Sequence, residues 1–163
     1  MTKTYTFLAV AIVFLAIDSR VDSSQDVMKD LSVKFGESMN QCIKEMDLPD
    51  VSADVFNYWK EDFVITRRET GCLFSCLAKK VNMQHSDGLV HKDNTHKFAM
   101  KHGADAEMAT KLVDIIHTCQ NSISESDDCL RVMGIANCFK KEVHKLDWAP
   151  SADLVTQELM AII

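Results

Sequence analysis

Six cysteines are the residues of this chain whose type and spacing point to chemistry, and that chemistry is disulfide formation. They follow an apolar amino-terminal run in a chain of 163 residues. An even number of cysteines in a small exported protein is typical of a disulfide framework. Cys72 and Cys76 are spaced i and i+4, so they share one face of a helix and can each reach a different partner element. The sequence therefore predicts a helical protein without a free thiol, held by bridges among Cys42, Cys72, Cys76, Cys119, Cys129 and Cys138.

The sequence offers little for catalysis or metal binding. It has no G-x-S-x-G, H-E-x-x-H, P-loop or EF-hand pattern. His85, His91 and His96 crowd one polar stretch, but no acidic or cysteine ligand stands at a settled helical spacing, so we expect a solvated loop rather than a zinc site. No nucleophile accompanies a histidine–carboxylate pair. We therefore predict that the protein is not an enzyme and that it holds neither a cofactor nor a metal.

The amino terminus predicts export. Lys3 provides a short positive region, and residues 7–17 form an apolar run that is too short to span a bilayer. Small residues precede Ser24, as signal cleavage requires, although charged neighbours leave the cut open by a few residues. We expect a signal peptide over residues 1–23 and one mature domain over residues 24–163; the alternative is a buried amino-terminal helix.

Composition and periodicity indicate an all-α domain that does not bind nucleic acid. The net charge of -6 lacks the basic face that nucleic-acid phosphates or an anionic membrane would need. Glycine and proline are scarce, at 5 and 2 residues, which disfavours a many-turned β sandwich. Apolar residues recur at helical spacing, and no segment shows clean strand alternation. Helices are expected over residues 27–46, around the apolar stripe 55–63, from a capping box at Thr66–Glu69 to Val81, over 98–102, 108–119 and 130–144, and in the tail.

Apolar side chains are more numerous than a small core needs. Nine methionines and eight phenylalanines are many for one domain, and methionine adapts to a flexible apolar guest. Ordinary core filling is the alternative for any single one of them. A hollowed core loses packing stability, and three bridges could offset several kcal/mol of that loss. The surplus therefore favours an internal apolar cavity.

A set of short motifs along the mature chain is distinctive. The motifs are Phe35-Gly36 before Cys42, Tyr58-Trp59-Lys60-Glu61, Arg68-Glu69-Thr70-Gly71-Cys72, Lys101-His102-Gly103-Ala104-Asp105, Cys138-Phe139-Lys140, His144-Lys145-Leu146 and Trp148-Ala149-Pro150. Together with the order of the cysteines, they resemble the motifs of moth pheromone-binding proteins, which belong to the insect odorant-binding family. The resemblance covers residues 24–163.

The resemblance implies a fold of six helices around an internal apolar cavity, with a carboxyl-terminal tail that can form a further helix. It implies the bridges Cys42–Cys76, Cys72–Cys129 and Cys119–Cys138, a pairing that the sequence alone leaves open. Family pockets are lined at positions that match Phe35, Trp59, Phe74, Phe98, Ile116 and Phe139, and Met28, Ser32 and Met83 are further expected wall residues.

The chain departs from the family pattern at the expected contact with the ligand head group. Many relatives carry a serine that bonds the head group, and this chain has Ala78 at that position. Ser75, Ser32 and Arg131 are the candidate replacements. The alternative is that these three side chains face water or cap the backbone.

The residues that make ligand release pH-dependent in the family are partly retained. Relatives gate the pocket with a loop histidine and a helix histidine, and these match His91 and His117. A second loop histidine is replaced by Lys92, and an acidic tail residue by Ile162. We expect the two histidines to be neutral in the closed form, and we expect a protonated tail to coil and compete for the cavity. The expected switch residues are His91, His117, Asp153 and Glu158.

The function implied by the resemblance is that of a secreted carrier. It would bind and solubilise long-chain sex-pheromone components, transport them through sensillar lymph to olfactory receptors, and release them in acid. The expected ligand is a long-chain acetate, aldehyde or alcohol, delivered to a receptor or a dendritic membrane by a monomer or weak homodimer. The alternatives are a general odorant-binding protein for plant volatiles, a membrane-active lipid-transfer protein and a secreted enzyme.

Overall fold

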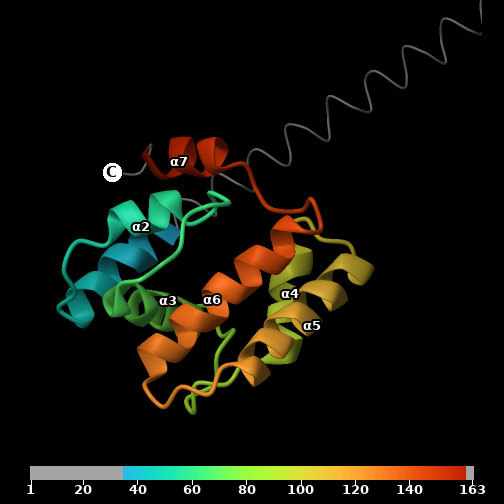
Figure 1. Cartoon of the computed structure of the whole chain (residues 1–163), viewed down its shortest axis with the longest axis horizontal. Helices are drawn as coiled ribbons and strands as arrows, with labels where there is room; N and C mark the ends of the chain where they lie inside the picture. Colours follow the sequence, from blue (N-terminus) through green and yellow to red (C-terminus); the bar gives the residue numbers. More distant parts are fainter. Residues whose placement is uncertain (1–34, 161–163) are drawn as a thin grey trace, which may run out of the picture.

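The computed structural model describes residues 35–160, which form helices joined by loops (Figure 1). A helical segment over residues 35–45 comes first. It is followed by α2 (Ser52–Asn57), α3 (Arg68–Lys80), α4 (Lys92–Lys101), α5 (Ala106–Ser122), α6 (Asp128–His144) and α7 (Ala152–Met160). The expected all-α class and the tail helix are confirmed, whereas the expected signal peptide over residues 1–23 lies outside the described residues. Between residues 35 and 160, no helix is long and apolar enough to cross a membrane.

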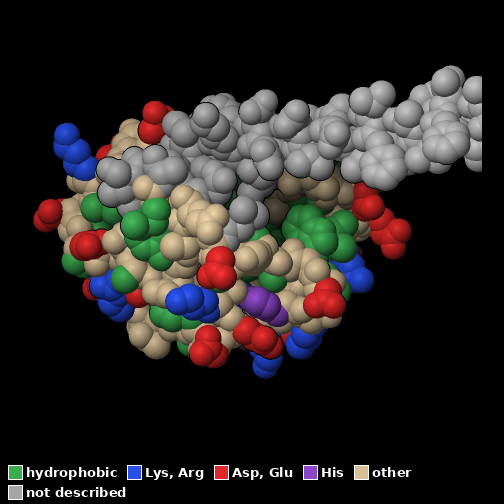
Figure 2. All heavy atoms as spheres, turned by 90° about the horizontal axis from the view of Figure 1, so that it is seen from above, with side chains coloured by type: hydrophobic (Ala, Val, Ile, Leu, Met, Phe, Trp, Pro, Cys, Tyr) green, Lys and Arg blue, Asp and Glu red, His purple; other side chains and the backbone are tan. Residues whose placement is uncertain are grey.

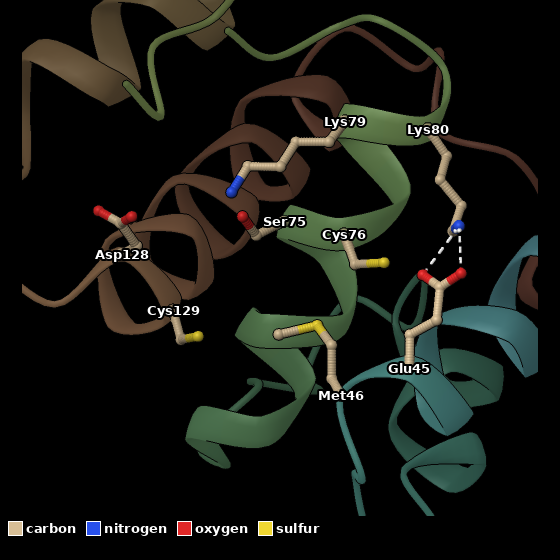
Figure 3. A pocket seen from close by; sticks show the side chains of 8 residues that line it. All are labelled: Glu45, Met46, Ser75, Cys76, Lys79, Lys80, Asp128 and Cys129. Carbon is tan, nitrogen blue, oxygen red and sulfur yellow. Dashed lines mark hydrogen bonds and ion pairs between the residues drawn. The ribbon is translucent and has the colours of Figure 1, made fainter. Parts of the chain in front are cut away.

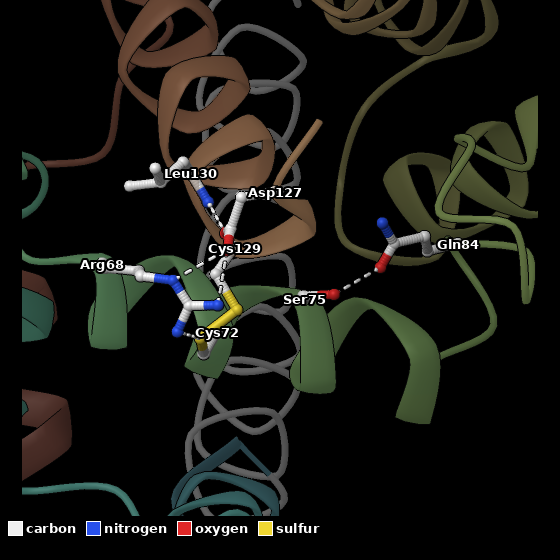
Figure 4. Close-up of a disulfide and its surroundings, with 7 residues drawn as sticks. All are labelled: Arg68, Cys72, Ser75, Gln84, Asp127, Cys129 and Leu130. Carbon is white, nitrogen blue, oxygen red and sulfur yellow. Dashed lines mark hydrogen bonds and ion pairs between the residues drawn. A yellow bond between two sulfur atoms is a disulfide. The ribbon is translucent and has the colours of Figure 1, made fainter. Parts of the chain in front are cut away.

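Helix α6 packs between two other helices of the fold. It packs against α3 on one side and α5 on the other, while α4 packs on α5 and α7 packs on α2 (Figure 1). Gly71 permits the close approach of α3 to α6, because a Cβ at this position would overlap the carbonyl oxygen of Cys129. The next residue, Cys72, forms a disulfide with Cys129 and so bridges the same contact (Figure 4).

Two further disulfides join neighbouring helices. Cys42–Cys76 links the segment 35–45 to α3, and Cys119–Cys138 links α5 to α6. All six cysteines are therefore paired, and none is free. The three pairs are those that the resemblance implies.

The buried apolar residues form two separate clusters. The first cluster lies among the segment 35–45, α2 and α3, and consists of Met39, Cys42, Val51, Val55, Leu73 and Leu77. The second cluster lies between α5 and the carboxyl-terminal end of α6, and consists of Ala104, Ala109, Leu112 and Val143. The two clusters use small or medium side chains at their centres, and larger aromatic side chains pack around them only partly buried.

The ends of the helices follow local rules in some places and tertiary contacts in others. Asp105 caps α5 by accepting the Met108 amide at 2.8 Å, as an acidic N-cap residue should. Gly103 has a φ of 99° and follows the end of α4, as its place in the sequence suggests. The expected capping box at Thr66 is wrong, because α3 begins at Arg68 and its N-cap residue, Arg67, makes no side-chain cap.

The start of α3 is set by a tertiary ion pair instead of a cap. Arg67 Nε donates to Asp54 Oδ2 at 2.9 Å, and Thr70 donates to the same oxygen. Burial opposes ionisation of Asp54, but these two hydrogen bonds outweigh burial, so its pKa lies below the usual value. This contact ties α2 to α3. The helix expected over residues 98–102 is also longer than the sequence indicates, since α4 begins at Lys92.

Candidate functional site

The expected wall residues that the structure describes are partly buried, and four of them pack against one or the other of the two clusters. Phe35 and Phe74 pack against the first cluster, whereas Trp59 and Phe139 pack against the second. Phe98 lies edge-on to the His102 ring, with ring centroids 4.2 Å apart. Ile116 and Met83 are half-buried. Met28 and Ser32 lie outside the described residues.

Tyr58 connects the aromatic residues of the two clusters. Its ring lies edge-on to Trp59 at 4.9 Å and edge-on to Phe74 at 5.2 Å, measured between centroids. Its hydroxyl donates to the carbonyl oxygen of Ala136 on α6 at 2.8 Å, and burial raises its pKa, so the phenol is neutral. The sequence analysis did not single out Tyr58, although it stands beside Trp59 in the same motif. The result is a line of aromatic side chains that runs from one apolar cluster to the other.

The segment that carries Tyr58 and Trp59 is bound to α6 through its main chain. We call residues 58–65 the strap. Asn137 receives the Ile65 amide hydrogen at 3.0 Å and donates to the Ile65 carbonyl at 2.9 Å. Lys140 is only 4% exposed, and its ammonium donates to the carbonyl oxygens of Lys60 and Phe63. The ring of His144 bonds to the carbonyl oxygen of Trp59.

The candidate head-group residues are already engaged with other parts of the protein. Ser75 is buried and donates to Gln84 at 3.0 Å (Figure 4). Arg131 pairs with Asp128 and donates to the Glu125 carbonyl at 3.3 Å. Both side chains therefore have protein partners in this structure.

Ser75 also faces a surface pocket away from the aromatic line. This pocket has a volume of about 520 Å³ and lies between the end of segment 35–45, α3 and the start of α6 (Figure 3). Its lining consists of Glu45, Met46, Ser75, Cys76, Lys79, Lys80, Asp128 and Cys129. No aromatic side chain lines it, so the structure does not bring Ser75 together with the expected aromatic wall at this pocket.

The expected switch histidines meet at a second surface pocket. It has a volume of about 560 Å³, and His91 and His117 both line it, together with Lys92. His85 joins them, because its ring stacks on the His91 ring at 4.3 Å. No group of three or more acidic, histidine or cysteine side chains in the described part of the chain could hold a metal ion. The three histidines nevertheless form one cluster. The sequence places His85 beside His91 in one polar stretch, but only the structure brings His117 to them.

A short hairpin forms the outer wall of this histidine pocket. We call residues 82–91 the hairpin; an isolated bridge pairs Gln84 with Val90, and Gly88 takes a φ of 84° at its turn. Gln84 donates to the Gly88 carbonyl at 2.7 Å, and Gln120 on α5 accepts the Val90 amide hydrogen at 2.7 Å. Residues 82–91 therefore form a more ordered segment than the solvated loop that the sequence suggests.

His91 also caps the helix that follows the hairpin. Its Nδ1 accepts the Asn94 amide hydrogen at 3.5 Å at the start of α4. On α5, the Asn121 amide lies 3.2 Å from Nδ1 of His117. Since a protonated imidazole has no acceptor, acid removes the ability of His91 to make this cap.

His102 is a further titratable residue, which was not among the site residues predicted from the sequence. It lies against Phe98, and its Nδ1 is buried without a hydrogen-bond partner among the described residues. Burial and the neighbouring Lys101 lower its pKa below the usual value. Its place in the Lys101–Asp105 motif, one of those that carry the family resemblance, is the feature of the sequence that could have indicated it.

The tail packs on the outside of α2 in this structure. Val155 contacts the first cluster, and Thr156 donates to the Phe56 carbonyl at 3.4 Å. Asp153 is exposed in the first turn of α7. The Glu158 side chain and Ile162 lie outside the described part of the structure.

The surface shows no concentration of one charge on the face drawn in Figure 2. Acidic and basic side chains are interspersed there, with hydrophobic side chains between them. Arg68 and Asp127 form an ion pair between α3 and the start of α6, with Nη2 and Oδ2 2.6 Å apart (Figure 4). The face drawn in Figure 2 therefore lacks the concentrated basic patch that a nucleic-acid interface needs.

Comparison with known proteins identifies the class to which this helical, disulfide-bonded architecture belongs. The sequence profile of the PBP/GOBP family matches residues 24–142. The chain is 42% identical to pheromone-binding protein 2 of Epiphyas postvittana over 153 residues, which cover 93% of each chain. It is 34% identical to general odorant-binding protein 1 of Bombyx mori over 136 residues, covering 82% of this chain and 83% of that protein.

A solved structure agrees with the sequence comparison. The crystal structure of Epiphyas postvittana pheromone-binding protein 3 superposes with a TM-score of 0.62 at 38% identity, covering 69% of this chain and 98% of that one. This chain belongs to the PBP/GOBP family. The family is one of binding proteins for small hydrophobic ligands, and it is not a family of enzymes.

Proposed function

We propose that this protein is a secreted carrier of long-chain sex-pheromone components. The observation that carries the proposal is the line of aromatic side chains from Phe74 through Tyr58 to Trp59, which joins two apolar clusters. A long, flexible, apolar chain with one polar end is the guest that such a line would accommodate. The 42% identity to a pheromone-binding protein, above the 34% to a general odorant-binding protein, supports a pheromone over a plant volatile.

The magnitudes suit a carrier that selects mainly by apolar shape. Burying about a dozen methylene groups yields on the order of 10 kcal/mol before costs, at about 0.8 kcal/mol for each group. Loss of ligand freedom removes much of this and leaves micromolar or tighter binding. A head-group hydrogen bond adds only about 1 kcal/mol. We therefore expect acetates, aldehydes and alcohols of one chain length to bind with similar affinity.

The first experiment is displacement of a fluorescent apolar probe by these ligands and by short terpenoids. Long chains should displace the probe at much lower concentration than terpenoids. Phe139→Ala and Phe35→Ala should weaken binding while far-ultraviolet circular dichroism stays near normal. Met100→Ala is the matched control, because Met100 is an exposed apolar side chain. Stronger displacement by terpenoids would favour the general odorant carrier, and unchanged binding in both phenylalanine variants would contradict the assigned site.

The proposal includes transport through sensillar lymph to a receptor or a dendritic membrane, where acid promotes release. The support is the cluster of His85, His91 and His117 at one pocket, since protonation would place like charges beside Lys92 and would break the His91 cap. Asp87 and Asp93 line the same pocket and would moderate the repulsion.

The tail is the second part of the proposed acid response. Protonation of Asp153 and Glu158 would make the tail more apolar, so that it could leave α2 and compete for the ligand site. Affinity should fall at least about tenfold, or about 1.4 kcal/mol, between pH 7 and pH 5. Deletion of residues 153–163 should restore much of the affinity in acid. A flat profile in the intact protein would contradict acid release without contradicting the carrier, and ligand-independent binding to vesicles would favour a lipid-transfer protein.

A further inference from the structure

The strap is bound from three positions on one face of α6. Asn137, Lys140 and His144 are spaced so that their side chains point in nearly the same direction from the helix. Each of them forms hydrogen bonds to the main chain of the strap, and the Lys140 ammonium also lies over the Phe63 ring, 6.0 Å from its centroid. These contacts fix the path of the strap.

The same part of α6 also contributes a wall residue. Phe139 immediately precedes Lys140, and it packs against the second cluster, as does Trp59 of the strap. Phe139 is therefore part of α6, whereas Trp59 is attached to α6 through the hydrogen bonds of the strap. Because α6 is a rigid helix, the distance between the two aromatic side chains depends on these hydrogen bonds.

His144 makes the contact that lies nearest to Trp59. Its Nε2 lies 3.0 Å from the carbonyl oxygen of Trp59. A carbonyl oxygen only accepts, so Nε2 carries the hydrogen, and this donor is present in both the neutral and the protonated ring. His144 is half-buried, and the hydrogen bond from its Nε2 links it to Trp59, one of the expected wall residues.

We propose that His144 is a positioning residue for ligand selection, which sets the position of Trp59 relative to Phe139 and thereby the chain length that fits best. This inference rests on the proposed function, because it takes Trp59 and Phe139 as walls of the ligand site. In this view the side chain that tunes selectivity does not touch the ligand. Loss of its hydrogen bond lets the Trp59 main chain move, which changes the room between the two aromatic rings.

The test compares His144→Leu with His144→Gln. Leucine removes the donor and approximates the size of the ring, whereas glutamine keeps an amide donor. Both are made in a Trp148→Phe background, because the chain has 2 tryptophans and Trp59 then becomes the sole tryptophan emitter. His96→Leu is the matched control, since His96 lies on α4 and bonds to Thr110 rather than to the strap.

The measurements are Trp59 emission and the ratio of affinities for two straight-chain acetates of about 12 and about 16 carbons, a difference of about four buried methylene groups. His144→Leu should shift the emission and change the affinity ratio about fivefold, the effect of about one hydrogen bond. His144→Gln should restore both readouts, and His96→Leu should leave both unchanged.

The possible failures are distinguishable. If the parent binds neither acetate, the proposed function is wrong and the inference is overturned with it. If the parent binds and a folded His144→Leu variant keeps the parent's emission and affinity ratio, only the positioning role is overturned. A uniform loss of affinity for both acetates, with an unchanged ratio, would likewise overturn it, because a purely structural role predicts that result.

Discussion

The strap and the hairpin are both non-helical segments laid over helices, but they are held in different ways. The strap is bound by side chains of α6, among them the buried ammonium group of Lys140, which donates to two of its carbonyl oxygens. The hairpin is bound by neutral amides, with Gln84 linking Ser75 to the turn and Gln120 holding Val90. Histidines and acidic side chains lie at its surface.

This difference in hydrogen-bonding groups predicts which segment is rigid and which opens. A hydrogen bond to a buried charge is stronger than one between neutral groups, and its loss leaves buried carbonyls without a partner. Neutral bonds near the surface can be exchanged for water at little cost, so such segments open locally at low free energy. We therefore expect the strap to define the fixed wall of the ligand site and the hairpin to open first.

The largest effect is expected from Lys140→Met. Methionine keeps most of the side-chain volume but removes the ammonium donor of the Phe63 carbonyl and one of the two donors of the Lys60 carbonyl, which also accepts the Phe63 amide hydrogen at 3.2 Å. The free energy of unfolding should fall by about 3 kcal/mol, because two carbonyl oxygens lose a charged partner. Urea denaturation measures the change. Lys141→Met is the matched control, since Lys141 is the exposed neighbour on α6 and should change stability little.

An unchanged stability in Lys140→Met would mean that the strap does not depend on its buried ammonium. The contrast between strap and hairpin would then have no energetic basis. The pKa of Lys140 is lowered by burial, which Asp62 and Glu61 oppose, and this direction agrees with a desolvated ammonium held by carbonyl oxygens.

A smaller and more local effect is expected from Gln84→Ala. The substitution removes the bonds to Ser75 and to the Gly88 carbonyl. Amide hydrogen exchange of Leu89 and Val90 should accelerate about fivefold, the equivalent of about 1 kcal/mol of local opening, while exchange in the strap stays unchanged. Equal acceleration in the strap would show that the two segments open together. Gln41→Ala provides the control, because Gln41 bonds only across one exposed turn to Glu45.

The smallest effect concerns the pH dependence of stability at His102. Burial lowers its pKa in the folded protein, and Lys101 adds to this effect, so below about pH 6.5 the unfolded chain binds more protons than the folded one. The contribution of His102 to the free energy of unfolding is therefore fully present above that pH and declines as the pH falls. His102→Gln should make the urea midpoint less dependent on pH between about 7 and 5 than in the parent.

His96→Gln gives the reference for that measurement, because it removes a histidine from the same helix without removing the buried one. An identical slope in the parent and in His102→Gln would show that His102 does not contribute to the acid response. The slope would then belong to other groups.

Particular residues show how far the sequence could be interpreted. Acidic N-cap residues such as Asp105 and the glycine after α4 follow local rules, and the structure agrees with them. The capping box at Thr66 obeyed the same rules and was wrong, because the Arg67–Asp54 ion pair fixed the start of α3 from outside the helix. The disulfide pairing needed a family resemblance, since bridges depend on which helices meet in space.

The candidate site shows the same division. Trp59 and Phe139 could be named from their motifs. The role of Tyr58, whose ring joins the two clusters, could not be inferred in this way, because it depends on contacts to Phe74 on α3 and to the Ala136 carbonyl on α6. His91 and His117 were named from the resemblance and His85 from its place in the same polar stretch as His91, and the structure brings the three to one pocket. Ser75 was named as a head-group anchor, and the structure gives it Gln84 as a partner.

The sequence by itself determined the helical class, most of the helical segments and the presence of a disulfide framework. Helical periodicity, capping and turn residues act over a few neighbours in the chain, so they can be inferred from the order of residues. Only the tertiary structure decided that α6 carries the strap, that two apolar clusters are joined by Tyr58, and that three histidines share a pocket. These contacts join residues far apart in the chain, and their geometry exists only once the helices have packed.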